Sequence, residues 1–166
     1  MSWAAWFVGW LWFAPSPPVC VVHVEGMPIS LLRHHSILVG AERREAARSV
    51  EIPRLDVEAL LVGPRYTGAS KLPDRCDAPV VLKAKPKPAR VKLTEAPPNT
   101  VVSCVDCPGI DPHANFLVSN LPPMVMKGWA MEVTFWVRAS GYESRREVAV
   151  LHPGQNDVRV PLNPRR

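Results

Sequence analysis

The residues best suited to chemistry gather between positions 104 and 113, in the order Cys104-Val-Asp-Cys107-Pro-Gly-Ile-Asp111-Pro-His113. In an oxidising compartment, Cys104 could form a disulfide with Cys107 or with Cys76 and so brace a small core. In a reducing compartment, Cys104, Cys107 and His113 could supply three of the four ligands of a zinc ion. Free thiols in a loop are the third interpretation.

Two features of this cluster favour the disulfide. Zinc sites usually take two ligands from each of two knuckles, and the sequence holds no second Cys-x-x-Cys. A thioredoxin-like pair needs a helix after its second cysteine, whereas Pro108-Gly109 favours a turn. We therefore predict a disulfide between Cys104 and Cys107, keep zinc bound by Cys104, Cys107 and His113 as the alternative, and expect no cofactor.

Catalytic motifs are missing from the sequence. Serine, histidine and aspartate are present, but there is no nucleophile elbow, phosphate loop or metalloprotease motif. His34 and His35 lie in a predicted strand, where neighbouring side chains point to opposite faces and do not share a metal. We therefore predict a protein that is not an enzyme and name no catalytic residue.

Two aromatic residues are candidates for contact with a partner. In the predicted strand over 132–137, Val133, Phe135 and Val137 share one face, and Trp136 lies on the other. Phe135 is then a core residue, while Trp136 covers a neighbouring module or contacts a partner. Tyr142 follows Gly141 at a strand exit. We expect its ring at the core edge and its hydroxyl bonded to backbone, with a contact role as the alternative.

An internal repeat organises the elements that carry these residues. Tyr142 follows Tyr66 by 76 positions, Leu162 follows Leu82 by 80, and the strand pattern at 91–95 follows that at 21–25 by 70. A repeated unit of this size indicates a repeated structural module. The 19 prolines exclude long helices and central strands from much of the chain, so we predict an all-β protein of two tandem modules.

The strands expected from alternation and turn residues are short. In the first module they cover 19–24, 31–39, 56–62 and 80–82; in the second they cover 91–93, 101–105, 116–118, 132–137, 147–151 and 158–162. The polar stretch 41–48 favours a helix by composition, with a turn or loop as the alternative. Strands of this length at such spacing are typical of a β-sandwich.

The second module resembles the PEGA domain family. The match consists of Val133–Val137, the pair Gly141-Tyr142, Val148–Leu151, Gly154 and Val158–Leu162. The family's Pro-Glu-Gly-Ala-like turn has only Asp106-Cys107-Pro108-Gly109 as its counterpart, after a strand rather than beside it. The first module resembles the family only through the repeat. The resemblance implies small immunoglobulin-like sandwiches that act as binding or spacer modules in bacterial cell envelopes, often next to a membrane.

Charge and composition divide the chain into four parts. We expect an apolar, Trp-rich segment over 1–18, a first module over 19–83, a Pro/Lys linker over 84–90 and a second module over 91–163. The net charge of +5 equals the five cations between Lys83 and Lys92. Alternating proline and lysine favours an extended, semi-rigid spacer. This run is a solvated connector or an electrostatic contact with anions, and no pattern for specific nucleic-acid binding accompanies it.

The apolar start bears on location. No charged side chain occurs before Val22, and Trp3, Trp6 and Trp10 would share one face of a helix. Such a segment suits an interfacial anchor, an export signal or a tail folded onto the sandwich. We expect a membrane-associated or extracytoplasmic protein that contacts a protein or cell-envelope polymer. The alternatives are a cytoplasmic regulatory or assembly domain without an anchor, and a fragment of a larger membrane-anchored receptor or kinase.

Overall fold

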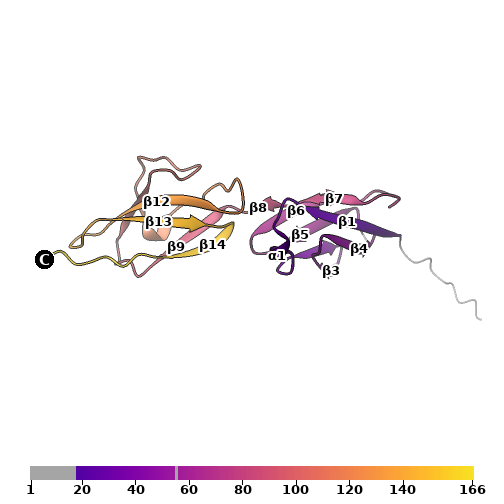
Figure 1. The fold of residues 1–166 in the computed structure, drawn as a ribbon, viewed down its shortest axis with the longest axis horizontal. Helices are drawn as coiled ribbons and strands as arrows, with labels where there is room; N and C mark the ends of the chain where they lie inside the picture. The colour runs from indigo at the N-terminus through magenta and orange to yellow at the C-terminus, as the bar shows by residue number, and fades with distance from the viewer. Residues whose placement is uncertain (1–17, 55) are drawn as a thin grey trace, which may run out of the picture.

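Strands dominate the computed structural model, which describes residues 18–54 and 56–166 (Figure 1). In this part of the chain, helical structure is limited to α1 (Ile29–Leu32) and the 3-10 helix η1 (Val118–Asn120). The predicted all-β fold is confirmed. The Trp-rich segment 1–17 lies outside the described residues, and so does everything predicted for it.

The first lobe, residues 18–86 without Leu55, has two sheets. Its strands are β1 (Val19–Glu25), β2 (Ser36–Val39), β3 (Glu42–Glu45), β4 (Ser49–Pro53), β5 (Glu58–Val62), β6 (Tyr66–Lys71), β7 (Val80–Lys83) and β8 (Lys85–Pro86). One sheet has the order β3-β2-β5-β6-β8 and the other the order β4-β1-β7. Neighbouring strands are antiparallel except for β1 and β7, which run parallel.

The second lobe, residues 87–166, also has two sheets. Its strands are β9 (Ala89–Thr94), β10 (Val101–Cys104), β11 (Phe116–Leu117), β12 (Met131–Arg138), β13 (Arg145–Leu151) and β14 (Gly154–Arg159). The larger sheet has the antiparallel order β11-β10-β12-β13. In the smaller sheet, β9 and β14 run parallel.

The two lobes share one topology. The order β3-β2-β5-β6 in the first lobe corresponds to β11-β10-β12-β13 in the second, and the parallel pair β1–β7 corresponds to β9–β14. Leu61 of β5 pairs with β2, and Val137 of β12 pairs with β10 in the same way. These two residues are 76 positions apart, which is also the spacing of Tyr66 and Tyr142.

Main-chain bonds correct the predicted alignment of the repeat at both of its ends. The N–H of Ala84 donates to Glu25 O in the first lobe, and the N–H of Val160 donates to Thr94 O in the second. The equivalent positions are therefore 69 apart at the front and 76 at the back. The predicted offsets of 70 and 80 misplace the front by one residue and the back by four.

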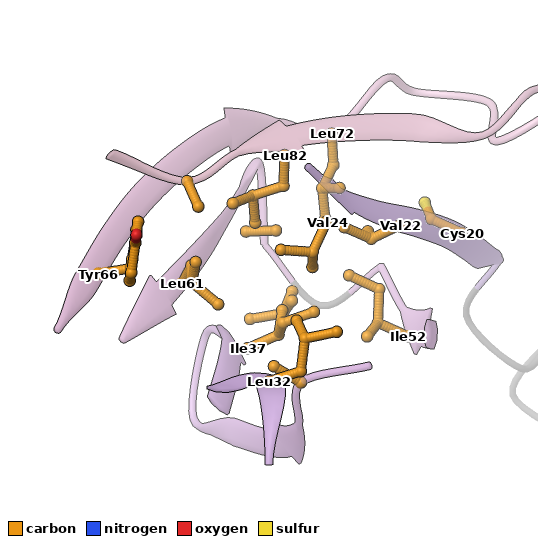
Figure 2. Packing of buried hydrophobic residues seen from close by; sticks show 14 residues of the cluster. Cys20, Val22, Val24, Leu32, Ile37, Ile52, Leu61, Tyr66, Leu72 and Leu82 are labelled. Atoms are coloured by element: carbon orange, nitrogen blue, oxygen red, sulfur yellow. The ribbon is translucent and has the colours of Figure 1, made fainter. Parts of the chain in front are cut away.

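Each lobe encloses its own apolar core between its two sheets. In the first lobe, β1 contributes every second residue, while β2, β5 and β7 contribute Ile37, Leu61 and Leu82 (Figure 2). In the second, Phe135 from β12 is fully buried, as the sequence predicts, although Thr134 on the opposite face is buried as well. Burying a side chain of this size stabilises the fold by about 1.5–3 kcal/mol. In Figure 1 the lobes lie end to end along the long axis.

Two elements of the first lobe differ from prediction. Residues 31–39 form the end of α1, a turn and then β2, rather than one strand. Residues 42–45 form β3, paired with β2 across a two-residue turn, although composition favoured a helix. Gly40 opens this turn with a φ of 57°, as the type II′ hairpin turn requires. Pairing to a buried neighbour therefore overrides the local helix propensity.

The Pro/Lys run is not a free connector over 84–90, although Lys83, Lys85 and Arg90 are exposed. Lys85–Pro86 is strand β8 against β6, and Ala89–Thr94 is strand β9 against β14. Ala84 and Ala89 are buried, which leaves positions 87 and 88 between the lobes. Proline is tolerated here because β8 is an edge strand, where one side of the backbone makes no ladder bonds.

Candidate functional site

The cysteine cluster is a closed structural element. Cys104 ends β10 and forms a disulfide with Cys107 in the following loop, with their Cα atoms 5.7 Å apart. The two residues are 0% and 6% exposed and belong to the core of the second lobe. Buried sulfurs of this kind are not accessible to a reducing partner or to an incoming metal.

The zinc alternative does not match the geometry. The ligand-type atoms that approach one another are those of Cys104, Asp106 and Cys107, and His113 lies exposed outside this group. Asp106 Oδ1 accepts a hydrogen bond of 2.8 Å from the N–H of Thr134 on β12. Asp106 thus fixes the loop to the neighbouring strand. Ile110 N–H donates to Cys107 O, so the chain turns directly after the disulfide and leads His113 away from it.

A second disulfide joins Cys20 to Cys76, and no free cysteine remains in the described part of the chain. From the sequence, Cys76 is a candidate only as the alternative partner of Cys104. The fold prevents that pairing because Cys76 packs against the first core and Cys104 lies in the second. The Cys20–Cys76 bond fixes the loop that precedes β7 to the start of β1.

The outer face of the larger sheet in the second lobe exposes several apolar side chains among the charged ones of Glu132, Arg138 and Arg146. Trp136, on the opposite side of β12 from Phe135, is 42% exposed. The register places Ser103 of β10 on one side of Trp136 and Arg146 of β13 on the other. Further along β13, Val148 and Val150 are 49% and 58% exposed. We call Trp136, Arg146, Val148 and Val150 the outer patch.

Tyr142 lies at the end of the strand pair β12–β13, outside the outer patch. It is half-buried, and its backbone forms an isolated antiparallel bridge with Pro164. None of the hydrogen bonds in the described residues involves its hydroxyl, so the predicted bond from that hydroxyl to backbone is wrong. The tail also pairs at Glu143, whose N–H donates to Asn163 O at 2.9 Å. Tyr142 and Trp136 therefore do not form one site.

Sequence reasoning missed a group of residues at the junction of the lobes. The guanidinium of Arg65, in the β5–β6 turn, lies 5.6 Å from the ring centre of Trp129 in the second lobe. Trp129 in turn packs against His152, with ring centres 4.5 Å apart. His152 Nδ1 is 3.0 Å from Trp129 O. The Nη1 atom of Arg65 is buried and has no hydrogen-bond partner, and its guanidinium makes a cation–π contact with the Trp129 ring.

Main-chain contacts complete the junction. Arg65 O accepts a hydrogen bond from the N–H of Lys87, and Gly63 O accepts one of 2.6 Å from Lys87 Nζ. Gly154, at the start of β14, approaches so closely that a Cβ there would lie 2.6 Å from Pro64 O. From the sequence, Gly63-Pro64 is predicted only to end a strand. A single sequence carries no signal for the contact of Pro64 with Gly154, which lies 90 residues further along the chain.

His35 supports the turn that makes these contacts. It is 2% exposed, its Nε2 accepts a 3.0 Å bond from the N–H of Tyr66, and its Nδ1 lies 2.9 Å from Leu31 O. These two bonds fix the neutral tautomer with its proton on Nδ1. Burial lowers the pKa of His35, against the opposing effect of the bond to Leu31. Burial likewise raises the pKa of the Tyr66 phenol.

His34 and His35 point to different environments, as predicted, but the alternation of a strand is not the cause. They lie in the turn after α1 and not in a strand, with His34 exposed and His35 buried. The two rings still do not share a site.

No helix in residues 18–54 or 56–166 is both long and apolar enough to cross a membrane. No known protein family, curated protein or solved structure matches this chain. The resemblance to the PEGA domain therefore stays a prediction.

Proposed function

We propose that this chain is a non-catalytic binding protein of the cell envelope, built from two tandem modules of one β type. The observation that carries the binding role is the outer patch around Trp136. A solvent-exposed tryptophan beside an arginine, with two exposed valines further along the neighbouring strand, resembles the surface that interfaces use, because aromatic and arginine side chains dominate binding energies.

The two disulfides support the location. Cys20–Cys76 and Cys104–Cys107 account for all four cysteines. Disulfides persist in exported proteins, whereas the cytosol keeps thiols reduced. We therefore propose a location outside the cytoplasm, in keeping with the apolar segment that precedes β1 in the sequence.

The repeated topology supports the two-module interpretation. The strand order and the single parallel pair recur in both lobes, and each lobe has its own core. Equivalent positions also expose apolar side chains, because Leu60 of β5 corresponds to Trp136 of β12 at the same spacing of 76. A duplicated module with an exposed apolar side chain at this shared position suits a PEGA-like binding element.

A spacer role is the second candidate, and the junction favours it. Arg65, Lys87 and Gly154 hold the two lobes end to end through one turn. A fixed joint between the lobes is what a spacer requires to keep its length, whereas a binding role depends on the outer patch.

Photo-crosslinking in the native cells tests the binding role. A photoreactive phenylalanine analogue replaces Trp136, and in a control protein it replaces Val57, which is 64% exposed in the first lobe. We expect adducts of discrete mass from position 136 only. Equal labelling at both positions, or none at either, would refute the binding role and leave the spacer.

Thiol titration of protein taken directly from these cells tests the location. We expect no free thiol before reduction and four after it. Four free thiols in unreduced material would instead indicate a cytoplasmic regulatory domain.

A further inference from the structure

Most edge strands of this fold are protected against pairing with another chain. A free strand edge exposes unpaired N–H and C=O groups, and proteins shorten, charge or interrupt such edges with proline. Here β3 has four residues with charged side chains, β4 ends in Pro53, β8 consists of Lys85 and Pro86, and β11 has two residues. The edges of the β9–β14 pair expose charged side chains such as Arg90, Lys92 and Asp157.

The edge strand β13 has none of these protections along its second half. It is seven residues long and contains neither proline nor glycine. Its exposed side chains at Val148 and Val150 are β-branched and apolar, as strands prefer. Within the described residues, none of the hydrogen bonds outside the β12–β13 ladder involves a main-chain group between Arg146 and Leu151. Every second residue there therefore offers an unpaired N–H and C=O on the side away from β12.

The equivalent edge in the first lobe is closed. Strand β6 corresponds to β13, and β8 pairs with it at Tyr66 and Thr67. Beyond that pair, the Oγ of Ser70 donates to Val81 O on β7, and Gly68 approaches Lys83 O so closely that a Cβ would lie 2.6 Å away. In the second lobe the tail pairs only before β13, at Gly141 and Glu143. The same strand is thus covered in one lobe and open in the other.

The side chains of β13 define what could pair with it. Arg145 forms an ion pair of 2.9 Å with Glu147 on the inner side of the strand. Arg146 points to the outer face beside Trp136 and forms no ion pair with a described residue. Going along β13, the outer face therefore presents one free cation followed by two apolar side chains.

We propose that β13 is a strand-addition site for an extended peptide of a partner protein. The peptide lies antiparallel to β13, with an acidic side chain beside Arg146 and β-branched side chains beside Val148 and Val150. Main-chain bonds to the open edge give affinity, and the alternate side chains give specificity. This assignment rests on the binding role proposed above and names its partner class.

A synthetic peptide provides the probe. The sequence Thr-Val-Thr-Val-Thr-Glu-Thr, with blocked ends and a fluorescent label, places glutamate beside Arg146 and valines beside Val148 and Val150 in the antiparallel register. Binding to the whole protein is measured by fluorescence anisotropy. A second peptide carries N-methyl groups on alternate residues and so lacks the donors for one edge. A third has lysine in place of glutamate.

The expected pattern separates edge pairing from nonspecific adhesion. The first peptide binds, and the N-methylated peptide does not. Arg146→Glu weakens binding of the glutamate peptide roughly fivefold and strengthens binding of the lysine peptide. A roughly fivefold change is the effect on affinity expected from one cross-strand charge pair. Val148→Lys reduces binding of the first peptide, and Val57→Lys, on an exposed site of the first lobe, leaves it unchanged. Circular dichroism of each variant confirms that the fold is intact.

Three results would overturn the assignment. The first is equal binding of the N-methylated peptide, and the second is no binding by any peptide. The third is a dimer, detected by sedimentation and abolished by Val148→Lys, in a protein that binds no peptide; a second copy would then occupy the edge. If crosslinks still form at position 136 in cells, the binding role stands and only strand addition fails.

Discussion

His35 illustrates how a single buried side chain can link one element to the joint between the lobes. Its Nε2 accepts the N–H of Tyr66, the residue that follows Arg65 in the junction turn. The charged groups nearest to it are His34 and Lys87, both of which oppose protonation. Protonating His35 places a proton on Nε2 and removes the acceptor that holds this turn.

The stability of the protein should therefore depend on the protonation of His35. Its pKa is lowered in the folded state, so the folded form binds the proton less readily than the unfolded form, whose pKa is about 6.5. The stabilisation is fully present above about pH 6.5 and is lost as the pH falls towards the lower folded-state pKa. Urea unfolding at pH 7.5 and 5.5 should show this loss in the native protein.

A matched pair of histidine variants isolates the effect. His35→Gln removes the titrating group and should unfold with a smaller difference between the two pH values. His34→Gln alters the exposed neighbour and should keep the native difference. An unchanged pH dependence in His35→Gln would show that other groups govern the acid response.

The two disulfides should contribute unequally to stability. In the chain-entropy model, the loop closed by Cys20–Cys76, with a sequence separation of 56, is worth about 4 kcal/mol, and the loop closed by Cys104–Cys107, with a separation of 3, about 2 kcal/mol. Replacing each pair by alanine avoids burying a hydroxyl. Urea unfolding of the two double variants should rank them in this order, and equal or reversed losses would contradict the entropic account.

Side-chain alternation was predictable residue by residue, and long-range pairing was not. The period of two along 132–137 placed Phe135 in the core and Trp136 on the surface, and the structure agrees. The disulfide between Cys20 and Cys76 had no such signal, because it depends on which strands meet. His113 was a plausible ligand by spacing alone, but the turn at Pro108-Gly109 leads it away from the sulfurs.

At the scale of elements, sequence patterns located strands better than they located pairing. Most strands of the second lobe begin or end within a few residues of the prediction, since alternating apolar residues mark them directly. Strand β14 is the exception, because it starts at Gly154 and its first residues are polar. Strand β6 was missed for the same reason, as Tyr66 is its only large apolar residue. Both strands form by pairing with a neighbour rather than by their own propensity.

The β2–β3 hairpin is an element in which one glycine decides between strand and helix. Gly40 has a φ of 57°, and a β-branched side chain there is strained. We expect Gly40→Val to lower the free energy of unfolding by roughly 1–3 kcal/mol. Ala41→Val, at the next position of the same turn, has no positive φ to maintain and serves as the control. Equal losses in urea unfolding would mean that the turn tolerates either residue.

At the scale of the whole molecule, the main question is what keeps the two lobes in a fixed arrangement. No strand pair crosses between the lobes within the described residues, and the cores are separate. The link consists of the Gly63–Tyr66 turn against Lys87, Trp129 and Gly154. The sequence predicted a free Pro/Lys spacer here because a linker and an edge strand have the same composition, and only the partner strand distinguishes them.

Gly154 is the residue through which this joint can be tested. Its φ is 88°, and an added Cβ would lie 2.6 Å from Pro64 O in the other lobe. Gly141 has a similar φ of 79°, but an added Cβ there meets nothing within 4 Å. Gly154→Ala therefore combines backbone strain with a clash across the junction, whereas Gly141→Ala has the strain alone. The difference between the two variants measures the contact between the lobes.

We expect both variants to fold, and Gly154→Ala to separate the lobes. Backbone strain at a positive φ destabilises each variant by about 1–2 kcal/mol. This strain alone should therefore lower the midpoint of thermal unfolding by a similar small amount in both variants. In small-angle X-ray scattering, Gly141→Ala should keep the dimensions of the native protein, because its neighbourhood is open. Gly154→Ala should show a broader distribution of dimensions, since Pro64 must move away and Arg65 then loses its place over Trp129. Identical scattering from the two variants would mean that the junction yields without opening, and that the lobes are held by the chain between them rather than by this turn.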